Sequence, residues 1–556
     1  MKLFIEGLRY CNQDDLNYQT NSFNLFDSRT KDGSLICRKV GYICLNGDPI
    51  FILPKIFLLD LAVSKLACSD GIKGVPFLLK DLNESKISYI QKVIFLHIMS
   101  IKTFKQRNPE TTILQEKKQL RVSNRANNKH QYIIELVLEF VNFYRKNKNF
   151  LLFNLFRHKS KIHKNVNWSR TVSKEFPAFT DEKTPIYFSI RNSKKEPYYE
   201  EELLVLFYSI LTDMIKRFGL SVKIESPIVR ISGKKLQKAI KSAPYLLRKI
   251  QYRYFSDIEK SMFSLVKSYC ELSQSVDESN NVSEYLVLNS YDIIFEDMVD
   301  YLISDSLINN DLKALKYHPD GKQLDHIYLG QGLFDVSEEI HYIGDSKYYK
   351  VANEIDKGSV FKQFTYARNI QAFYLSSLKY KNKVTRYIES NKYIKYKDKI
   401  TKGYNVIPNF FIRAGLHSDA SFSDPGFSFD SDETQSFYQE YNNLHDANTY
   451  FILSYNVNYL YLLSSYANRS SSVLLKTSIQ QSIRSDFVKF MNNNFVFYKK
   501  EFISLEQLEE FVQEYFFKLN GKIYRTNSNP YELILSTRPS DIELNHIFDG
   551  EIFKLV

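Results

Sequence analysis

The stretch from residue 323 to 349 reads QLDHIYLGQGLFDVSEEIHYIGDSKYY and decides the predicted fold. Its two apolar runs suit adjacent strands, and the glycines between them start the connection. Side chains alternate faces along a strand, so Asp345 and Lys347 are expected to project to the same side. Asp325 heads the first strand and is expected beside Asp345. Two carboxylates placed together are costly unless a cation lies between them, so the segment predicts a metal site.

Magnesium is the natural occupant of such a site, because it is hard, prefers oxygen ligands and suits phosphate substrates. Mn²⁺ is the alternative metal. Lys347 adds a positive charge near the attacking water and the charge that builds on phosphate in the transition state. Upstream, FEDMVDYL predicts an amphipathic helix, whose Glu296 reaches the same site directly or through water. The predicted catalytic residues are Glu296, Asp325, Asp345 and Lys347, with Glu296, Asp325 and Asp345 as the metal ligands.

The triplet (D/E)-x-K is a weak signal by itself, because it occurs six times in this chain. The triplet at Asp345 is distinguished by its setting. An apolar strand precedes it, an aspartate-led strand lies about twenty residues earlier, and an acidic helix precedes both. This context selects Asp345 and Lys347. The alternative is that the two residues form an ordinary ion pair on a surface strand.

Basic residues gather downstream of this segment. The formal net charge of the chain is +12, and residues 341–402 hold +9 of it. Clustered Lys and Arg favour a polyanion such as DNA, although a solvated helix face explains the charge equally well. Lys350 and Lys362 are the cations expected to contact DNA. Gln363 and Tyr366, one turn apart on the following helix, either contact the DNA backbone or form an ordinary polar face.

Histidines near the predicted site are left outside it. His326 alternates to the face opposite Asp325, and His341 lies roughly 13 Å from Asp345 along the strand, too far to share a metal. The basic stretch over residues 158–164 contains two further histidines. Without an acidic or Cys neighbour, this stretch is interpreted as a solvated loop.

The composition describes a globular chain of several domains. Its 556 residues are 44% hydrophobic and 25% charged, which suggests two to four domains. Five scattered cysteines without a C-x-x-C pair indicate reduced thiols in a cytoplasmic protein. No secretory signal is predicted. The uncharged stretch 450–467 is rich in Ser, Asn and Tyr, and therefore predicts a buried core and no membrane span.

The pattern of elements predicts a multidomain α/β fold in four parts. These are a β-rich N-terminal module over residues 1–115, a mainly helical linker or partner-binding region over 116–284, an α/β core with a mixed central sheet over 285–480, and a small α/β extension over 481–556. Short apolar runs predict strands at residues 35–37, 40–44 and 50–53. Apolar residues at three- and four-residue spacing predict long helices at residues 132–144, 200–218 and 234–273.

The residues of the predicted site resemble a known nuclease core. Glu296, Asp325 and Asp345-Ser-Lys347, followed by Gln363-Phe-Thr-Tyr366, are similar to the PD-(D/E)xK core with the Q-x-x-Y extension of RecB-like and McrC-like nucleases. Leu324 stands where the family has Pro before the first aspartate. This resemblance implies a restriction-endonuclease-like α/β core in which Asp325 and Asp345 bind metal, Lys347 is catalytic and Glu296 supports them.

Two further stretches resemble the McrC group. KVGYIC at residues 39–44 with IFILPKI at 50–56 is similar to a V-G-x-I strand followed by I-L-P-K-I. NVNWSRT at 165–171 is similar to I-N-W-x-x-T, although His163-Lys164 stands where a Gly is usual. Together the motifs are most similar to the LlaJI-type restriction endonucleases, in which a McrC-like nuclease subunit works with a separate AAA+ GTPase. The last eighty residues match no motif of that group.

The resemblance implies partners for this chain. They are double-stranded DNA, a McrB-like AAA+ GTPase motor, and a second active site, because one site cuts one strand. The stretch SGKK at 232–235 lacks the earlier glycine and the Ser or Thr of a Walker A motif, so nucleotide would bind to another chain. Two other functions stay open. One is a self-sufficient RecB-like exonuclease, and the other is a non-catalytic adaptor that stimulates a partner GTPase.

Overall fold

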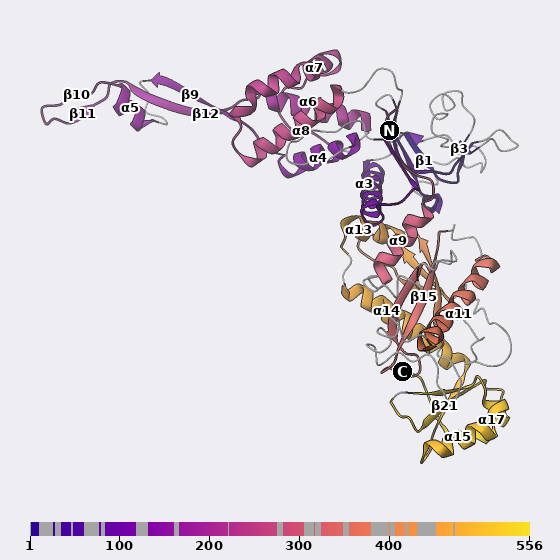
Figure 1. Cartoon of the computed structure of the whole chain (residues 1–556). Helices are drawn as coiled ribbons and strands as arrows, with labels where there is room; N and C mark the ends of the chain where they lie inside the picture. The colour runs from indigo at the N-terminus through magenta and orange to yellow at the C-terminus, as the bar shows by residue number, and fades with distance from the viewer. Residues whose placement is uncertain are drawn as a thin grey trace.

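The computed structural model is a mixed α/β molecule in which a long arm extends away from a larger body (Figure 1). A β-rich N-terminal module comes first, followed by a helical bundle that carries the arm, a second sheet with its helices, and a small C-terminal sheet. The structure describes residues 2–10, 26–27, 35–45, 48–59, 77–78, 84–117, 132–148, 150–160, 166–218, 220, 222–274, 282–304, 316, 324–348, 355–379, 400, 406–416, 421–430, 452–470, 473–526 and 528–556.

The N-terminal module is built on a six-stranded mixed sheet in the order β7-β1-β6-β5-β13-β8. Its strands are β1 (Lys2–Ile5), β5 (Val40–Leu45), β6 (Asp48–Leu53), β7 (Phe77–Leu78), β8 (Leu114–Lys117) and β13 (Val282–Leu288). A three-stranded sheet lies in the same part of the chain and consists of β2 (Arg9–Tyr10), β4 (Leu35–Cys37) and β3 (Phe26–Asp27). The three strands predicted in this region are confirmed as β4, β5 and β6.

A strand from far along the sequence completes the six-stranded sheet. β13 is antiparallel to both β5 and β8, so the chain returns to the N-terminal module after the helical bundle. The approach is close at Gly41, where a Cβ atom would lie 2.2 Å from the backbone oxygen of Leu286, and the φ angle of 143° also favours glycine. The expected domain boundary between residues 284 and 285 falls inside β13.

Helices cover this sheet and form the adjoining bundle. They are α3 (Glu84–Arg107), η1 (Lys55–Leu59), α4 (Ile133–Lys146), α6 (Glu202–Phe218), α7 (Gly233–Ile250), η3 (Gln251–Arg253) and α8 (Asp257–Gln274). Residues 234–273 are largely helical as predicted, but the prediction of one continuous helix was wrong, because the segment divides into α7 and α8. The reason is a capping box, in which Ser256 Oγ accepts from the Glu259 N–H while Glu259 Oε2 accepts from the Ser256 N–H.

The arm is a two-stranded hairpin with a small tip (Figure 1). β9 (Phe153–Ser160) pairs antiparallel with β12 (Ile190–Pro197), and the tip carries α5 (Trp168–Lys174), β10 (Ala178–Phe179) and β11 (Pro185–Ile186). The prediction of a solvated loop over residues 158–164 was wrong for 158–160, which lie in β9 and form ladder pairs with β12. The rest of that stretch lies outside the described residues.

The second sheet has five strands in the order β14-β15-β16-β18-β17. These are β14 (His326–Gln331), β15 (Glu339–Lys347), β16 (Asn409–Gly415), β18 (Ile452–Asn458) and β17 (Ser428–Phe429). β14 is antiparallel to β15, whereas β16 is parallel to both β15 and β18, so the sheet is mixed as predicted. The helices beside it are α9 (Asp292–Ile303), α11 (Lys357–Lys379), α13 (Tyr459–Asn468) and α14 (Val473–Asn494).

The core confirms the interpretation of the uncharged stretch at residues 450–467. Its described part forms β18 and all but the last residue of α13, and most of its side chains are buried. Among the described residues no helix combines the length and apolar character needed to cross a bilayer. This part of the chain therefore packs inside the protein.

The C-terminal extension is a small α/β unit with a four-stranded sheet in the order β20-β21-β19-β22. Its elements are β19 (Val496–Glu501), α15 (Leu505–Glu514), α16 (Phe516–Leu519), β20 (Ile523–Arg525), β21 (Glu532–Thr537), α17 (Ile542–Phe548) and β22 (Glu551–Phe553). It is attached to the loop between β14 and β15, where Glu338 accepts a hydrogen bond from Tyr524 and Asp335 accepts one from the Ser528 N–H.

Candidate active site

All four predicted catalytic side chains line one cleft. The cleft has a volume of about 490 Å³, and its walls come from the N-terminal module and from the second sheet. Glu296, Asp325, Asp345 and Lys347 lie on the wall formed by the second sheet and α9. Lys362 of α11 also lines the cleft. The structure therefore brings together side chains that stand up to 66 residues apart in the sequence.

Asp345 and Lys347 lie at the carboxyl end of β15, and both are buried. The ammonium of Lys347 forms an ion pair with Oδ2 of Asp345, which confirms that the two side chains share a face of the strand. Lys347 also donates a hydrogen bond of 2.9 Å to Oγ of Ser359, in the first turn of α11. A buried ion pair in a cleft differs from the solvated surface pair that the sequence left open as an alternative.

Asp325 lies beside Asp345 because of the strand register. His326 pairs with Gly344 across the antiparallel strands, so one further step places Asp325 opposite Asp345. Oδ2 of Asp325 accepts a hydrogen bond of 3.1 Å from the Ser346 N–H. Burial raises the pKa of Asp325 well above its usual value, and the negative charges of Asp345 and Glu296 raise it further.

Glu296 reaches this cluster from the second turn of α9. Burial raises its pKa to about 7, and the carboxylates of Asp292 and Asp345 add to this effect, while Lys362 and Lys347 oppose it. These shifts show that the negative charges lie close enough to repel one another in a poorly solvated site. Such an arrangement favours the binding of a proton or a cation.

Asp325 and Asp345 suit a magnesium ion as a pair of oxygen ligands. Asp345 is buried and Asp325 is half-buried, and Oδ2 of Asp345 is in contact with the ammonium of Lys347. Among the residues that the structure describes, no three Asp, Glu, His or Cys side chains are gathered closely enough to hold a metal ion. Of the two roles expected for Glu296, contact through a water molecule therefore agrees better with the structure than direct ligation.

The residues expected to contact DNA differ in how far their side chains are exposed to solvent. Gln363 is only 1% exposed, and its side-chain amide has no hydrogen-bond partner among the residues that the structure describes. Tyr366 is also buried, in an apolar cluster between α11 and the sheet. Lys362 is exposed, and its ammonium lies 5.4 Å from the centroid of the Tyr366 ring. Lys350 lies outside the described residues.

A chain of polar contacts behind the site involves a histidine that sequence reasoning set aside. Nε2 of His326 hydrogen bonds with Oγ of Ser346, the residue between Asp345 and Lys347. Nδ1 of His326 lies 3.4 Å from Asp300, which forms an ion pair of 2.6 Å with Lys316. Burial alone would raise the pKa of Asp300, but His326 and Lys316 hold it well below its usual value.

The opposite wall of the cleft is hydrogen bonded to the residue that follows β15. Tyr348, which follows Lys347, donates a hydrogen bond to Oε2 of Glu6. The Lys55 N–H lies 3.1 Å from the Tyr348 hydroxyl and 3.2 Å from Oε2 of Glu6, and the Lys55 ammonium lies 4.2 Å from the centroid of the Tyr348 ring. The sequence gives no local signal for this contact, because Glu6 and Tyr348 are 342 residues apart.

Comparisons with known proteins give two distant likenesses. No protein-family model and no curated protein matches the chain. A half-complex from a tetradecameric assembly of Thermococcus gammatolerans McrB AAA+ hexamers with bound McrC shows 11% identity and a TM-score of 0.29, over 87% of this chain and 99% of that chain. The Thermococcus gammatolerans McrBC complex shows 11% identity and a TM-score of 0.17, over 55% of this chain and 88% of that chain. At these TM-scores neither likeness establishes a shared fold.

Proposed function

We propose that this chain is the nuclease subunit of a two-component, LlaJI-type restriction system and hydrolyses phosphodiester bonds of double-stranded DNA. The observation that carries the proposal is the convergence of three side chains in one cleft with Glu296 beside them: the half-buried carboxylate of Asp325, and the buried carboxylate of Asp345 and ammonium of Lys347. The mixed sheet that positions them fits a PD-(D/E)xK core. We place the activity in the cytoplasm, where foreign DNA enters.

Each side chain has a role in this proposal. Asp325 and Asp345 supply the oxygen ligands for Mg²⁺, or for Mn²⁺ in its place. The bound cation would lower the pKa of a water molecule and offset the charge of the phosphate. Lys347, oriented by Ser359, donates hydrogen bonds to a phosphate oxygen on which negative charge develops. Glu296, whose pKa is raised to about 7 by burial and nearby carboxylates before a cation binds, would accept a proton from the attacking water.

We also propose that a McrB-like AAA+ GTPase controls this site. Residues 1–556 contain no Walker A sequence, which agrees with a motor on a separate subunit. The tip of the arm supports such a contact, because its exposed side chains include Trp168, Phe179 and Phe188 as well as Phe176, which is 97% exposed. Large apolar side chains gathered on a projecting tip are typical of a protein interface. A double-strand break would further require two copies of the chain.

Substitution of Asp345 tests the catalytic assignment. The variant Asp345→Ala should lose DNA cleavage in the presence of Mg²⁺, GTP and the partner while it still binds the partner. Glu510→Ala, which removes an exposed carboxylate of the C-terminal unit, is the matched control and should cut normally. Unchanged cleavage by Asp345→Ala would overturn the assignment. If partner GTPase stimulation and phage restriction both survive the substitution, the chain acts as an adaptor.

A second assay separates the restriction subunit from an autonomous exonuclease. The purified chain is incubated with Mg²⁺ and linear duplex DNA in the absence of GTP and of any partner. We expect intact DNA under these conditions and cleavage after the partner and GTP are added. Progressive degradation from the DNA ends by the chain alone would favour the RecB-like alternative.

A further inference from the structure

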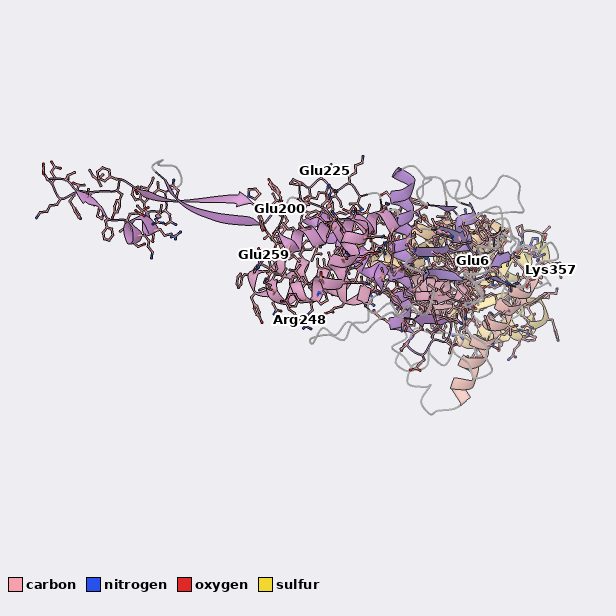
Figure 2. The ribbon with its side chains drawn as sticks, turned by 90° about the horizontal axis from the view of Figure 1, so that it is seen from above. Glu6, Glu200, Glu225, Arg248, Glu259 and Lys357 are labelled. Carbon is pink, nitrogen blue, oxygen red and sulfur yellow. The ribbon has the colours of Figure 1, made fainter. Side chains whose placement is uncertain are left out.

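The outer face of α7 is strongly basic and lies apart from the candidate active site. Residues 226–256 contain eight Lys and Arg and no Asp or Glu. All eight side chains are exposed, and they belong to Arg230, Lys234, Lys235, Lys238, Lys241, Arg248, Lys249 and Arg253. Figure 2 shows Arg248 at the edge of the helical bundle, away from Glu6 of the cleft. This basic face is a feature that the proposed catalytic role does not use.

The basic face is fixed in orientation because the opposite face of α7 is buried. Leu236, Ile240 and Leu247 pack into the bundle against α6 and α8. On the outer side, Lys234, Lys238, Lys241, Tyr245 and Arg248 follow one another at intervals of four, three, four and three residues. Residues at these intervals lie one above another on a helix. They therefore form one stripe along α7.

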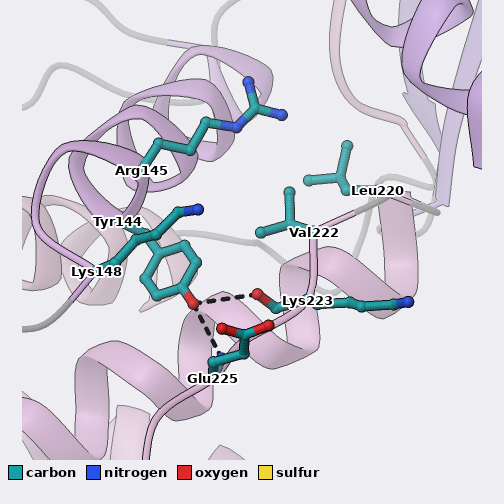
Figure 3. A pocket seen from close by; sticks show the side chains of 7 residues that line it. All are labelled: Tyr144, Arg145, Lys148, Leu220, Val222, Lys223 and Glu225. Carbon is teal, nitrogen blue, oxygen red and sulfur yellow. Dashed lines mark hydrogen bonds between the residues drawn. The ribbon is translucent and has the colours of Figure 1, made fainter.

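The segment that leads into α7 is also anchored to the bundle. The hydroxyl of Tyr144 in α4 donates to the Lys223 carbonyl oxygen at 3.1 Å and accepts from the Glu225 N–H at 3.0 Å (Figure 3). The Ile231 N–H donates to Oγ of Ser209 in α6 at 2.9 Å. These bonds fix the start of α7 relative to two other helices. The stripe therefore presents its charges on a rigid support.

We propose that the outer face of α7 binds the phosphate backbone of DNA at a surface separate from the catalytic cleft. Its 18 residues span about 27 Å along the helix axis. One strand of DNA carries a phosphate about every 3.4 Å along the duplex axis, so this length equals about eight base-pair steps. Side chains three or four residues apart are separated by about 4.5 to 6 Å along the axis, which allows successive cations to meet different phosphates.

Exposed aromatic side chains beside the cations also suit a nucleic acid. Tyr245 is 80% exposed, Tyr252 is 78% exposed and Phe255 is 76% exposed. Rings of this kind stack on unpaired bases of single-stranded nucleic acid while neighbouring Lys and Arg contact phosphate. Beside a duplex, whose bases are already stacked, they would meet the sugar–phosphate backbone. A protein partner usually meets a surface of mixed charge. Residues 226–256 contain no Asp or Glu, and the carboxylate of Glu202 meets this segment only at its end, in an ion pair with Arg253. These observations favour DNA over an acidic protein surface.

This inference goes beyond the proposed nuclease function, although the choice of DNA as the ligand rests on it. A second DNA-binding surface, away from the cleft, would hold the substrate whether or not a phosphodiester bond is cut. Backbone contacts position DNA without reading its sequence. The basic face should therefore affect DNA affinity and its dependence on salt, not the choice of cleavage site.

The test measures DNA binding without cleavage. Fluorescence anisotropy of a labelled 40-base-pair duplex is followed in EDTA over a range of salt concentrations, with the full chain. The variant Lys234→Gln/Lys238→Gln/Arg248→Gln removes three exposed charges from α7. The control Lys518→Gln/Arg538→Gln/Lys554→Gln removes two Lys and one Arg that are exposed in the C-terminal unit. Both variants therefore have the same net charge.

We expect the α7 variant to bind DNA about tenfold to a hundredfold more weakly than the unmodified chain at 0.1 M salt. The slope of log affinity against log salt should fall by about 2 to 3, while the control changes little. Equal losses in both variants, or no loss in the α7 variant, would overturn the proposal. Tighter binding of poly-L-glutamate than of duplex would assign the face to an acidic protein and also overturn it. Because EDTA prevents cleavage, these outcomes are independent of whether Asp345→Ala abolishes cutting.

Discussion

The carboxyl group of Glu296 should reduce the stability of the folded chain when no metal is bound. Burial and nearby carboxylates raise its pKa from 4.5 to about 7. Below pH 4.5 the group is protonated in both the folded and unfolded states, so it has no effect on stability. As the pH rises from about 4.5 to about 7, the unfolded state loses its proton first, and the folded state becomes progressively less stable. The loss of folding stability caused by Glu296 levels off above pH 7.

The size of this effect follows from the pKa difference. A pKa of about 7 in place of 4.5 corresponds to about 3 kcal/mol at pH 8. Because part of the side chain faces solvent and water screens its charge, about 1 to 3 kcal/mol is a reasonable range. At pH 5 the same relation gives less than about 1 kcal/mol. The substitution Glu296→Gln removes the charge and nearly preserves the shape, so it should stabilise the chain at pH 8 and much less at pH 5.

Thermal unfolding in EDTA measures this difference. A gain of about 1 to 3 kcal/mol should raise the Tm of the transition that includes the second sheet by about 2 to 10 °C at pH 8. Glu510→Gln, at an exposed position, should leave Tm nearly unchanged at both pH values. Addition of Mg²⁺ should stabilise the unmodified chain more than Glu296→Gln. An equal rise of Tm at pH 5 and pH 8, or no rise at pH 8, would refute the reasoning that charge repulsion acts on Glu296.

Three further predictions concern residues around the cleft and on the arm. His326→Ala should lower kcat for DNA cleavage by about tenfold to a hundredfold with little change in KM, and His326→Asn should restore part of it, because the histidine acts through its hydrogen bond. Equal loss in both variants would contradict a positioning role. Tyr348→Phe should lower the free energy of unfolding by about 1 kcal/mol in urea titrations, because the bond to Glu6 is lost, and unchanged stability would count against that bond. Phe176→Ser with Phe188→Ser should leave Tm unchanged but reduce stimulation of the partner GTPase, and full stimulation would exclude the arm tip as the contact.

The pairing of Asp325 with Asp345 was predictable because it depends on local rules. Alternation along a strand sets the face of Asp345, and an antiparallel partner brings the head of the first strand beside it. The antiparallel pair of β14 and β15 was also predictable, since both are short apolar runs with turn residues between them. Patterns within about thirty residues were sufficient for this part of the site.

Other features depend on contacts that sequence patterns do not record. β13 joins β5 across more than two hundred residues, and nothing in its sequence specifies that partner. His326 does lie on the face away from Asp325, as alternation predicts, yet it hydrogen bonds with Ser346 behind the site. Gln363 lies on the expected helix, but helical periodicity alone did not indicate that its amide would be buried.

The connection between β13 and α9 shows how the site can be controlled from outside the second sheet. β13 belongs to the N-terminal sheet, and α9 begins at Asp292, four residues after β13 ends at Leu288. Glu296 is thus attached through a short connection to the N-terminal module, whereas Asp325 and Asp345 belong to the second sheet. A displacement of one unit relative to the other changes how closely these carboxylates approach. Under the proposed control by a partner subunit, binding to the bundle or the arm would reach the site through this connection, without any rearrangement inside the second sheet.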